Sequence, residues 1–318
     1  MNPLIPLLRP EALHIPDGFL SLAIALLFWA ITIILIIIAA RKTRGEFGEQ
    51  QIPLMGLMAA FIFAAQMINF PVAGGTSGHL LGGVLAAVTL GPWGGILVMS
   101  SVIAVQGIFF QDGGLLAMGA NIFNMGLLTA LIGYGLYRGV LNRPRNVRLA
   151  VIGAAAWLST MAAAFVTALQ LWLSGTSQLN IVLPAMLGVH ALIGIGEALI
   201  TVGAVAFILN ARPDLLETPK ESAPKGGRGW IWGGAAAALA VIFLAPLASA
   251  SPDGLERVAE DLGFLGRGLD APYQILPDYT LPGLPEGAFS TILAGLLGAL
   301  LVAAISFGIS RLLQSQKS

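Results

Sequence analysis

The chain contains a series of uninterrupted apolar runs, the first of which covers residues 19–40 and ends at a cluster of basic residues that begins with Arg41. A membrane-spanning helix needs about 20 apolar residues, because each residue adds about 1.5 Å and the hydrocarbon core is about 30 Å thick. The runs are continuous and do not alternate with a period of two, which favours helices over a barrel. Because 57% of the residues are hydrophobic, 10% are charged and the mean hydropathy is +0.86, we predict an all-α polytopic membrane protein.

The remaining apolar runs predict a seven-helix core and two further transmembrane helices. The piece at residues 80–90 ends at Gly91-Pro92 and is too short to span upright, so we expect it to be tilted or partly sunk between its neighbours. The other predicted spans are residues 52–70, 93–110, 115–137, 149–173, 181–209, 230–250 and 288–310.

Changes in composition predict how the chain is divided. Residues 1–12 are an irregular, proline-containing N-terminal extension without the features of a signal peptide. Residues 13–210 are the seven-span core, and residues 211–229, rich in Pro, Lys, Glu and Gly, are a cytoplasmic linker. Residues 230–318 are a two-span domain whose polar loop, residues 251–287, is expected to be extracytoplasmic.

The distribution of charge predicts the orientation in the membrane. Nine spans place the termini on opposite sides, and with the N-terminus outside and the C-terminus in the cytoplasm, all of the sixteen basic residues except Arg9, Arg257 and Arg267 face the cytoplasm. We therefore expect a multi-pass protein of the inner or plasma membrane, in contact with the lipid bilayer. The zero net charge gives no indication of a nucleic-acid partner, and the absence of Cys excludes disulfides and thiolate ligands.

Two of the three histidines, His14 and His79, fall on the same predicted outer face. Imidazole suits nickel, cobalt, copper and zinc, so one interpretation is that both side chains bind a single transition-metal ion. The glycines around His79 would allow another backbone to approach closely. The alternative is that His14 is an interfacial residue and that His79 is hydrogen-bonded within a loop.

Five further polar residues are candidates for supporting or structural roles. His190 and Glu197 are two helical turns apart on one face, where they could form a functional ionisable pair or an interhelical hydrogen bond. Asn121 and Asn124 also share a face, and interhelical hydrogen bonding is favoured over metal binding for both. Asp17 is either a structural cap or an outer partner of an imidazole.

Several motifs occur together along residues 13–210: HIPDGFLS, VAGGTSGHLLGG, LGPWGGILVM, GANIFNMG and HALIGIGEALIT. In this order they resemble the CbiM/NikM family, the metal-binding membrane components of cobalt and nickel energy-coupling-factor transporters, a class of ABC transporters. The later stretch SPDGLERVAEDLGF resembles the PDGLE domain, and the two-span portion is similar to the small NikN-type accessory subunit.

The resemblance implies a substrate-capture component of an ATP-driven uptake transporter, which binds Ni(II) or Co(II) on the extracytoplasmic side. It implies no enzymatic activity, no catalytic residues and no covalently bound cofactor. The partners would be a transmembrane coupling subunit and cytoplasmic ATPase subunits, since the chain has no GxxxxGK[ST] phosphate-binding motif of its own, and no HExxH protease motif either. The alternative is a vitamin-binding component of a related transporter.

The resemblance also implies a ligand set. In the family the metal is held by a terminal amine, the backbone nitrogen and the imidazole of the adjoining histidine, and a second histidine in the glycine-rich loop. These histidines correspond to His14 and His79, but twelve residues precede Leu13, so a chain that begins at Met1 has no amine beside His14. The extension could be removed, or another donor could be used, or translation could begin at Leu13. We favour Leu13 as the initiator residue.

Overall fold

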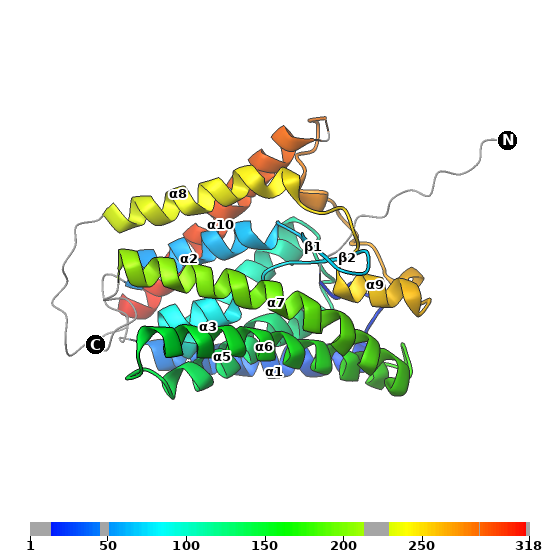
Figure 1. Ribbon diagram of the computed structural model, residues 1–318. Helices are drawn as coiled ribbons and strands as arrows, with labels where there is room; N and C mark the ends of the chain where they lie inside the picture. Colours follow the sequence, from blue (N-terminus) through cyan, green and yellow to red (C-terminus); the bar gives the residue numbers. More distant parts are fainter. Residues whose placement is uncertain (1–13, 45–50, 213–228, 286, 316–318) are drawn as a thin grey trace.

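The structure, a computed structural model, describes residues 14–44, 51–212, 229–285 and 287–315 (Figure 1). The expected extension, the initiator residue Leu13 and most of the expected linker lie outside the described residues. Seven of the described helices are long and apolar enough to cross a membrane, and the 16-residue α2 is a shorter apolar helix. The prediction of an all-α polytopic membrane protein is therefore confirmed. The helices that form the bundle are α1 (Leu22–Thr43), α2 (Gln51–Gln66), α3 (Gly83–Phe109), α4 (Met118–Asn121), α5 (Thr129–Arg138), α6 (Arg145–Leu173), α7 (Leu179–Ala211), α8 (Gly229–Leu244) and α10 (Ala288–Ser315).

The start of α1 is set by a side-chain cap. Ser21 has an extended backbone, and its hydroxyl group accepts a hydrogen bond from the Ile24 nitrogen at 3.4 Å. The apolar residues Phe19 and Leu20 precede the helix and are buried in the protein, so α1 begins later than the predicted span at residues 19–40. The apolar run alone could not show this difference, because a buried irregular segment and a lipid-facing helix use the same residue types.

α3 folds back on itself at Gly91. Gly91 has φ 76°, a left-handed conformation that favours glycine, and Pro92 follows it without a backbone N–H. A Cβ atom on Gly95 would lie only 2.8 Å from the Ala87 Cα atom, whereas residues eight apart in a straight helix are separated by about 12 Å. The two arms of α3 therefore pack side by side, which agrees with the prediction of a short apolar piece sunk between its neighbours.

The fifth predicted span contains a π-helical segment. α4 continues into η1 (Ile122–Leu128) and then into α5 without leaving helical geometry. π-helical turns widen a helix locally and occur often at functional sites. Asn121 and Asn124 both lie at this segment, and both are buried.

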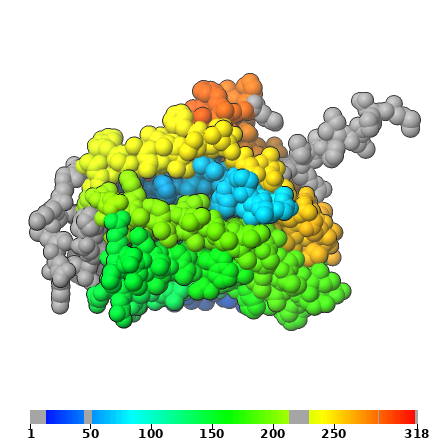
Figure 2. Space-filling view, viewed as in Figure 1, coloured from blue at the N-terminus to red at the C-terminus, as the bar shows by residue number. Residues whose placement is uncertain are grey.

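The C-terminal part of the chain packs along α2 and closes over one end of the bundle. α8 and α10 contact α2, and between them the chain forms η3 (Ala245–Leu247), α9 (Gly254–Asp261), η4 (Leu265–Arg267) and η5 (Pro277–Tyr279). α9 lies at the same end as the antiparallel ribbon of β1 (Phe70–Val72) and β2 (Thr76–Gly78) (Figures 1 and 2). We call this end, which also carries His14 and His79, the site end. The C-terminal end of α10 lies at the opposite end of the bundle.

The close contact between the arms of α3 predicts the effect of a minimal substitution. Gly95→Ala places a methyl group against the Ala87 backbone, which cannot move aside like a flexible side chain, so we expect a loss of about 1–3 kcal/mol in stability. The measurement is the thermal unfolding midpoint of the purified protein in detergent.

Gly135→Ala is the matched control, because a Cβ atom there meets nothing within 4 Å. We expect its midpoint to equal that of the unmodified protein. Equal midpoints for the Gly95→Ala and Gly135→Ala variants would contradict the helical hairpin.

Candidate metal site

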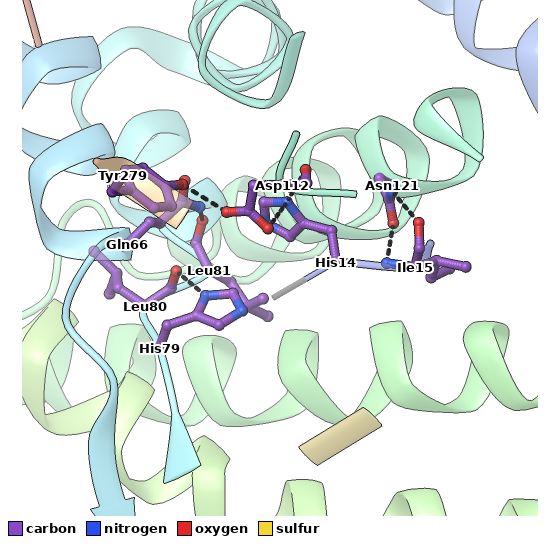
Figure 3. Close-up of polar contacts among 9 residues, drawn as sticks. All are labelled: His14, Ile15, Gln66, His79, Leu80, Leu81, Asp112, Asn121 and Tyr279. Atoms are coloured by element: carbon purple, nitrogen blue, oxygen red, sulfur yellow. Dashed lines mark hydrogen bonds and ion pairs between the residues drawn. The ribbon is translucent and has the colours of Figure 1, made fainter. Parts of the chain in front are cut away.

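The structure brings His14 and His79 together at the site end. Their rings meet edge to face with centroids 5.6 Å apart, and their exposed fractions are 2% and 8% (Figure 3). His14 lies in the irregular segment before α1, and His79 follows β2 in the loop that leads into α3. At this separation, two buried imidazoles could bind one ion between them.

Asp112, in the loop between α3 and α4, holds one edge of the His14 ring. His14 Nδ1 lies 3.0 Å from the Asp112 backbone oxygen and 3.2 Å from its carboxylate Oδ1 (Figure 3). His14 Nε2 is buried and has no hydrogen-bond partner among the described residues. An unsatisfied buried polar atom costs about 1–3 kcal/mol, and such atoms are often explained by a ligand or ion.

The orientation of His14 bears on the ligand set that the family resemblance implies. A metal can bind both the backbone nitrogen and the ring of one histidine only through Nδ1, the ring nitrogen closer to the backbone. In the structure Nδ1 contacts Asp112, and Nε2 is the nitrogen without a partner.

The segment that carries His14 is clamped by side chains and backbone of the α3–α4 region. The Asn121 amide accepts a hydrogen bond from the Ile15 nitrogen and donates one to the Ile15 oxygen, both at 3.0 Å, as a neighbouring strand would. The Ile15 oxygen also accepts from the Gly114 nitrogen at 2.9 Å. Asp17 Oδ1 accepts from the Ala117 nitrogen at 3.0 Å, which gives Asp17 a structural role.

Glu197 of α7 holds the loop that carries His79. Its carboxylate accepts hydrogen bonds from the Leu81 nitrogen at 2.6 Å and from the Gly82 nitrogen at 3.1 Å. The Gln66 side chain of α2 donates to the Leu81 oxygen at 2.8 Å. His79 Nδ1 lies 3.0 Å from the Leu80 oxygen, which fixes the plane of the imidazole. Glu197 therefore acts on His79 through the loop.

All three histidines line one small cavity. The cavity measures about 70 Å³, and its wall includes His190 of α7 and, from the C-terminal part of the chain, Asp253 and Gly254. His190 Nδ1 lies 2.8 Å from the oxygen of Met186 in its own helix. The described residues hold no group of three or more His, Cys, Asp or Glu side chains placed to bind a metal.

Asn124 also lines this cavity, and it takes part in an interhelical hydrogen-bond network. It exchanges hydrogen bonds with the Gln170 amide of α6 at 2.7 and 3.0 Å, and it donates to Thr167 Oγ1 at 3.1 Å. The two asparagines therefore have different tasks, since Asn121 holds the His14 segment and Asn124 joins helices.

Asp112 and Tyr279 also belong to the site, although the sequence did not indicate them. The Tyr279 hydroxyl donates to Asp112 Oδ2 at 2.5 Å. Loss of water around the hydroxyl and the negative charge of Asp112 raise the pKa of Tyr279 well above its usual value, so the hydroxyl stays protonated. Asp112 could have been suspected as the one acidic residue between two predicted spans at the site end, whereas Tyr279 has no such signal.

Comparisons with known proteins identify the family of the chain. Residues 14–215 match the family model CbiM, described as the cobalt uptake substrate-specific transmembrane region, and residues 227–315 match the PDGLE domain. A putative fused nickel transport protein NikMN of Archaeoglobus fulgidus is 38% identical over 94% of this chain and 98% of its own length. The fused nickel transport protein NikMN of Rhodobacter capsulatus is 30% identical over 92% of this chain and 95% of its own.

A solved structure supports the fold of the core. A truncated transition metal transporter is 34% identical to this chain, with a TM-score of 0.57, and the match covers 62% of this chain and 99% of that one. The matched family model covers more than half of the chain, and the relatives align over nearly all of it. The chain belongs to the CbiM family of cobalt and nickel transport components and carries a fused PDGLE domain.

Proposed function

We propose that this protein captures Ni(II) or Co(II) on the extracytoplasmic side of the cell membrane and delivers it to an ATP-driven uptake transporter. His14 and His79 bind the ion through their imidazole rings. A transmembrane coupling subunit and cytoplasmic ATPase subunits supply the energy for transport. The N-terminus and the site end lie outside, and the opposite end faces the cytoplasm.

The observation that carries this proposal is the convergence of two buried imidazoles from segments far apart in the chain. His14 Nε2 is buried without a partner, and the His79 ring lies edge to face with it. Neutral imidazole is a common ligand of nickel and cobalt.

The size of the cavity disfavours the vitamin-binding alternative. Pockets for drug-sized organic ligands usually have volumes of about 300–1,000 Å³. The cavity lined by the histidines measures about 70 Å³, and Asp253, Gly254 and Leu255 form part of its wall. A dehydrated metal ion fits this space, and an organic vitamin does not.

Replacement of His79 tests the ligand assignment. His79→Ala removes one of two proposed imidazole donors, and we expect nickel affinity, measured by isothermal titration calorimetry on the full-length protein, to fall by at least 100-fold. His190→Ala removes the same ring from α7, where its Nδ1 contacts its own helix, and we expect a loss of about tenfold or less. Nickel affinity of the His79→Ala variant equal to that of the unmodified protein would refute the assignment.

Binding should also depend on pH. Protonated imidazole cannot bind a metal, so affinity for nickel should fall as the pH is lowered and the histidine ligands take up protons. The measurement is the dissociation constant at several pH values between about 5 and 8. An affinity that does not change across this range would exclude histidine ligands.

A further inference from the structure

α2 packs lengthwise against α10 of the PDGLE domain, and glycines in α10 make room for its side chains (Figure 1). A Cβ atom on Gly298 would collide with the tip of the Phe63 ring, so the ring fills the space that a larger residue would need. Met67 fills a similar space at Gly295, where a Cβ atom would lie 3.0 Å from the Met67 Cε atom. Side chains of α2 therefore enter two notches in α10, and both notches exist because their residues are glycine.

The contacts between α2 and α10 fix one register. Further along the pair, a Cβ atom on Gly56 of α2 would lie 3.1 Å from the Ala303 oxygen of α10. Gly56, Phe63 and Met67 are seven and four residues apart, so they share one face of α2, and their partners follow in the reverse order along α10. Because these contacts are spread over about 16 Å of α2, the two helices cannot slide past each other without losing all of them.

A neighbouring face of α2 supports the loop that carries His79. The Ile62 side chain packs beside Gly82, where a Cβ atom would lie 2.8 Å from the Ile62 Cγ2 atom. One turn further, Gln66 donates its hydrogen bond to the Leu81 oxygen at 2.8 Å (Figure 3). Both side chains of α2 are fully buried. One short helix thus contacts α10 with one face and the His79 loop with another.

We propose that α10 of the PDGLE domain positions the His79 loop of the metal site by fixing the place of α2. Phe63 in the Gly298 notch is the positioning contact toward the accessory domain, and Gln66 is the positioning contact toward the loop. The two side chains are three residues apart, so a displacement of one carries the other with it. This proposal rests on the proposed function, and it gives a membrane helix of the accessory domain a role in metal binding.

Close packing explains how the position of α10 can reach the loop. Protein interiors have few voids, so a displaced ring moves the helix that carries it. Groups that orient a metal ligand from outside the first shell typically contribute 10–100-fold to metal affinity. Glu197 of α7 holds the same loop from its other side through the Leu81 and Gly82 nitrogens. A disturbance of α2 leaves that hold intact, so we expect weaker nickel binding and not its complete loss.

The experiment compares three glycine-to-alanine variants of α10 in the full-length protein. Gly298→Ala drives a methyl group against the Phe63 ring, Gly295→Ala meets the flexible Met67 side chain, and Gly308→Ala meets nothing within 4 Å. Nickel alone is titrated by calorimetry. We expect Gly298→Ala to weaken nickel binding about tenfold, Gly295→Ala to weaken it less, and Gly308→Ala to match the unmodified protein.

Histidine ring signals separate a change of position from a general loss of stability. The protein is labelled with ¹⁵N in histidine, and because the chain has three histidines, the signals of His79 are assigned from their loss in His79→Gln. Without metal, we expect Gly298→Ala to shift the His79 signals and to leave those of His190 unchanged. A protein that is only destabilised would keep the His79 signals of its folded fraction in place.

Two further variants test the route through α2. Gln66→Met keeps the size of the side chain and removes its hydrogen bond to Leu81, so we expect it to weaken nickel binding about tenfold. If Gly298→Ala acts through Gln66, the double variant should bind nickel no more weakly than Gln66→Met alone. Phe63→Leu shortens the side chain that the new methyl group meets, and we expect it to recover part of the affinity lost in Gly298→Ala.

The outcomes separate the proposal from its alternatives. No recovery with Phe63→Leu would assign the effect to Phe110, whose Cζ atom lies 2.7 Å from the same Cβ position, and would overturn the proposal. Losses that simply add in the double variant, or an unchanged nickel affinity in Gln66→Met, would also overturn it, and the Gln66→Met result holds whether or not Gly298→Ala folds. If the unmodified protein binds no nickel, the proposed function fails, while shifted His79 signals in Gly298→Ala still support the positioning of the loop.

Discussion

The site depends on the requirement that irregular backbone inside a membrane protein must find its hydrogen bonds within the protein. Both segments that carry the site histidines are irregular and buried. Asn121 satisfies the Ile15 peptide group from both sides. Glu197 and Gln66 together satisfy Leu81 and Gly82. Without these polar side chains neither segment could remain between the helices, and His14 and His79 would not meet.

The PDGLE domain adds a second layer to this arrangement. The Pro252 oxygen accepts hydrogen bonds from the Ser77 nitrogen at 2.8 Å and from Thr76 Oγ1 at 3.0 Å, which ties the segment between η3 and α9 to β2. Leu269 pairs with Asp17 beside the His14 segment. Helices of the core therefore hold the segments that carry His14 and His79 on one side, and the accessory domain holds them on the other. These contacts explain how part of the accessory domain comes to lie in the wall of the cavity.

Much of the fold could be predicted from the sequence because apolar length and basic clusters are strong local signals. The apolar runs predicted the helices, and Gly91-Pro92 indicated the turn between the two arms of α3. The proximity of His14 and His79 could be predicted because the charge distribution placed both residues on one face, and the motifs supported this prediction. Asp112 and Tyr279 were missed, since their contact joins residues 167 positions apart and carries no local pattern. Glu197 was singled out, but its partner is the backbone of a loop, which side-chain spacing cannot reveal.

The most direct test of the account is X-ray absorption spectroscopy at the nickel edge on the full-length, nickel-loaded protein. Imidazole rings give a distinctive scattering pattern beyond the first shell of nitrogen ligands. We predict a fit that requires two imidazoles in the unmodified protein and one in His14→Gln. A nickel environment without imidazole scattering, or one that is the same in His14→Gln, would contradict the central claim that His14 and His79 jointly bind the ion.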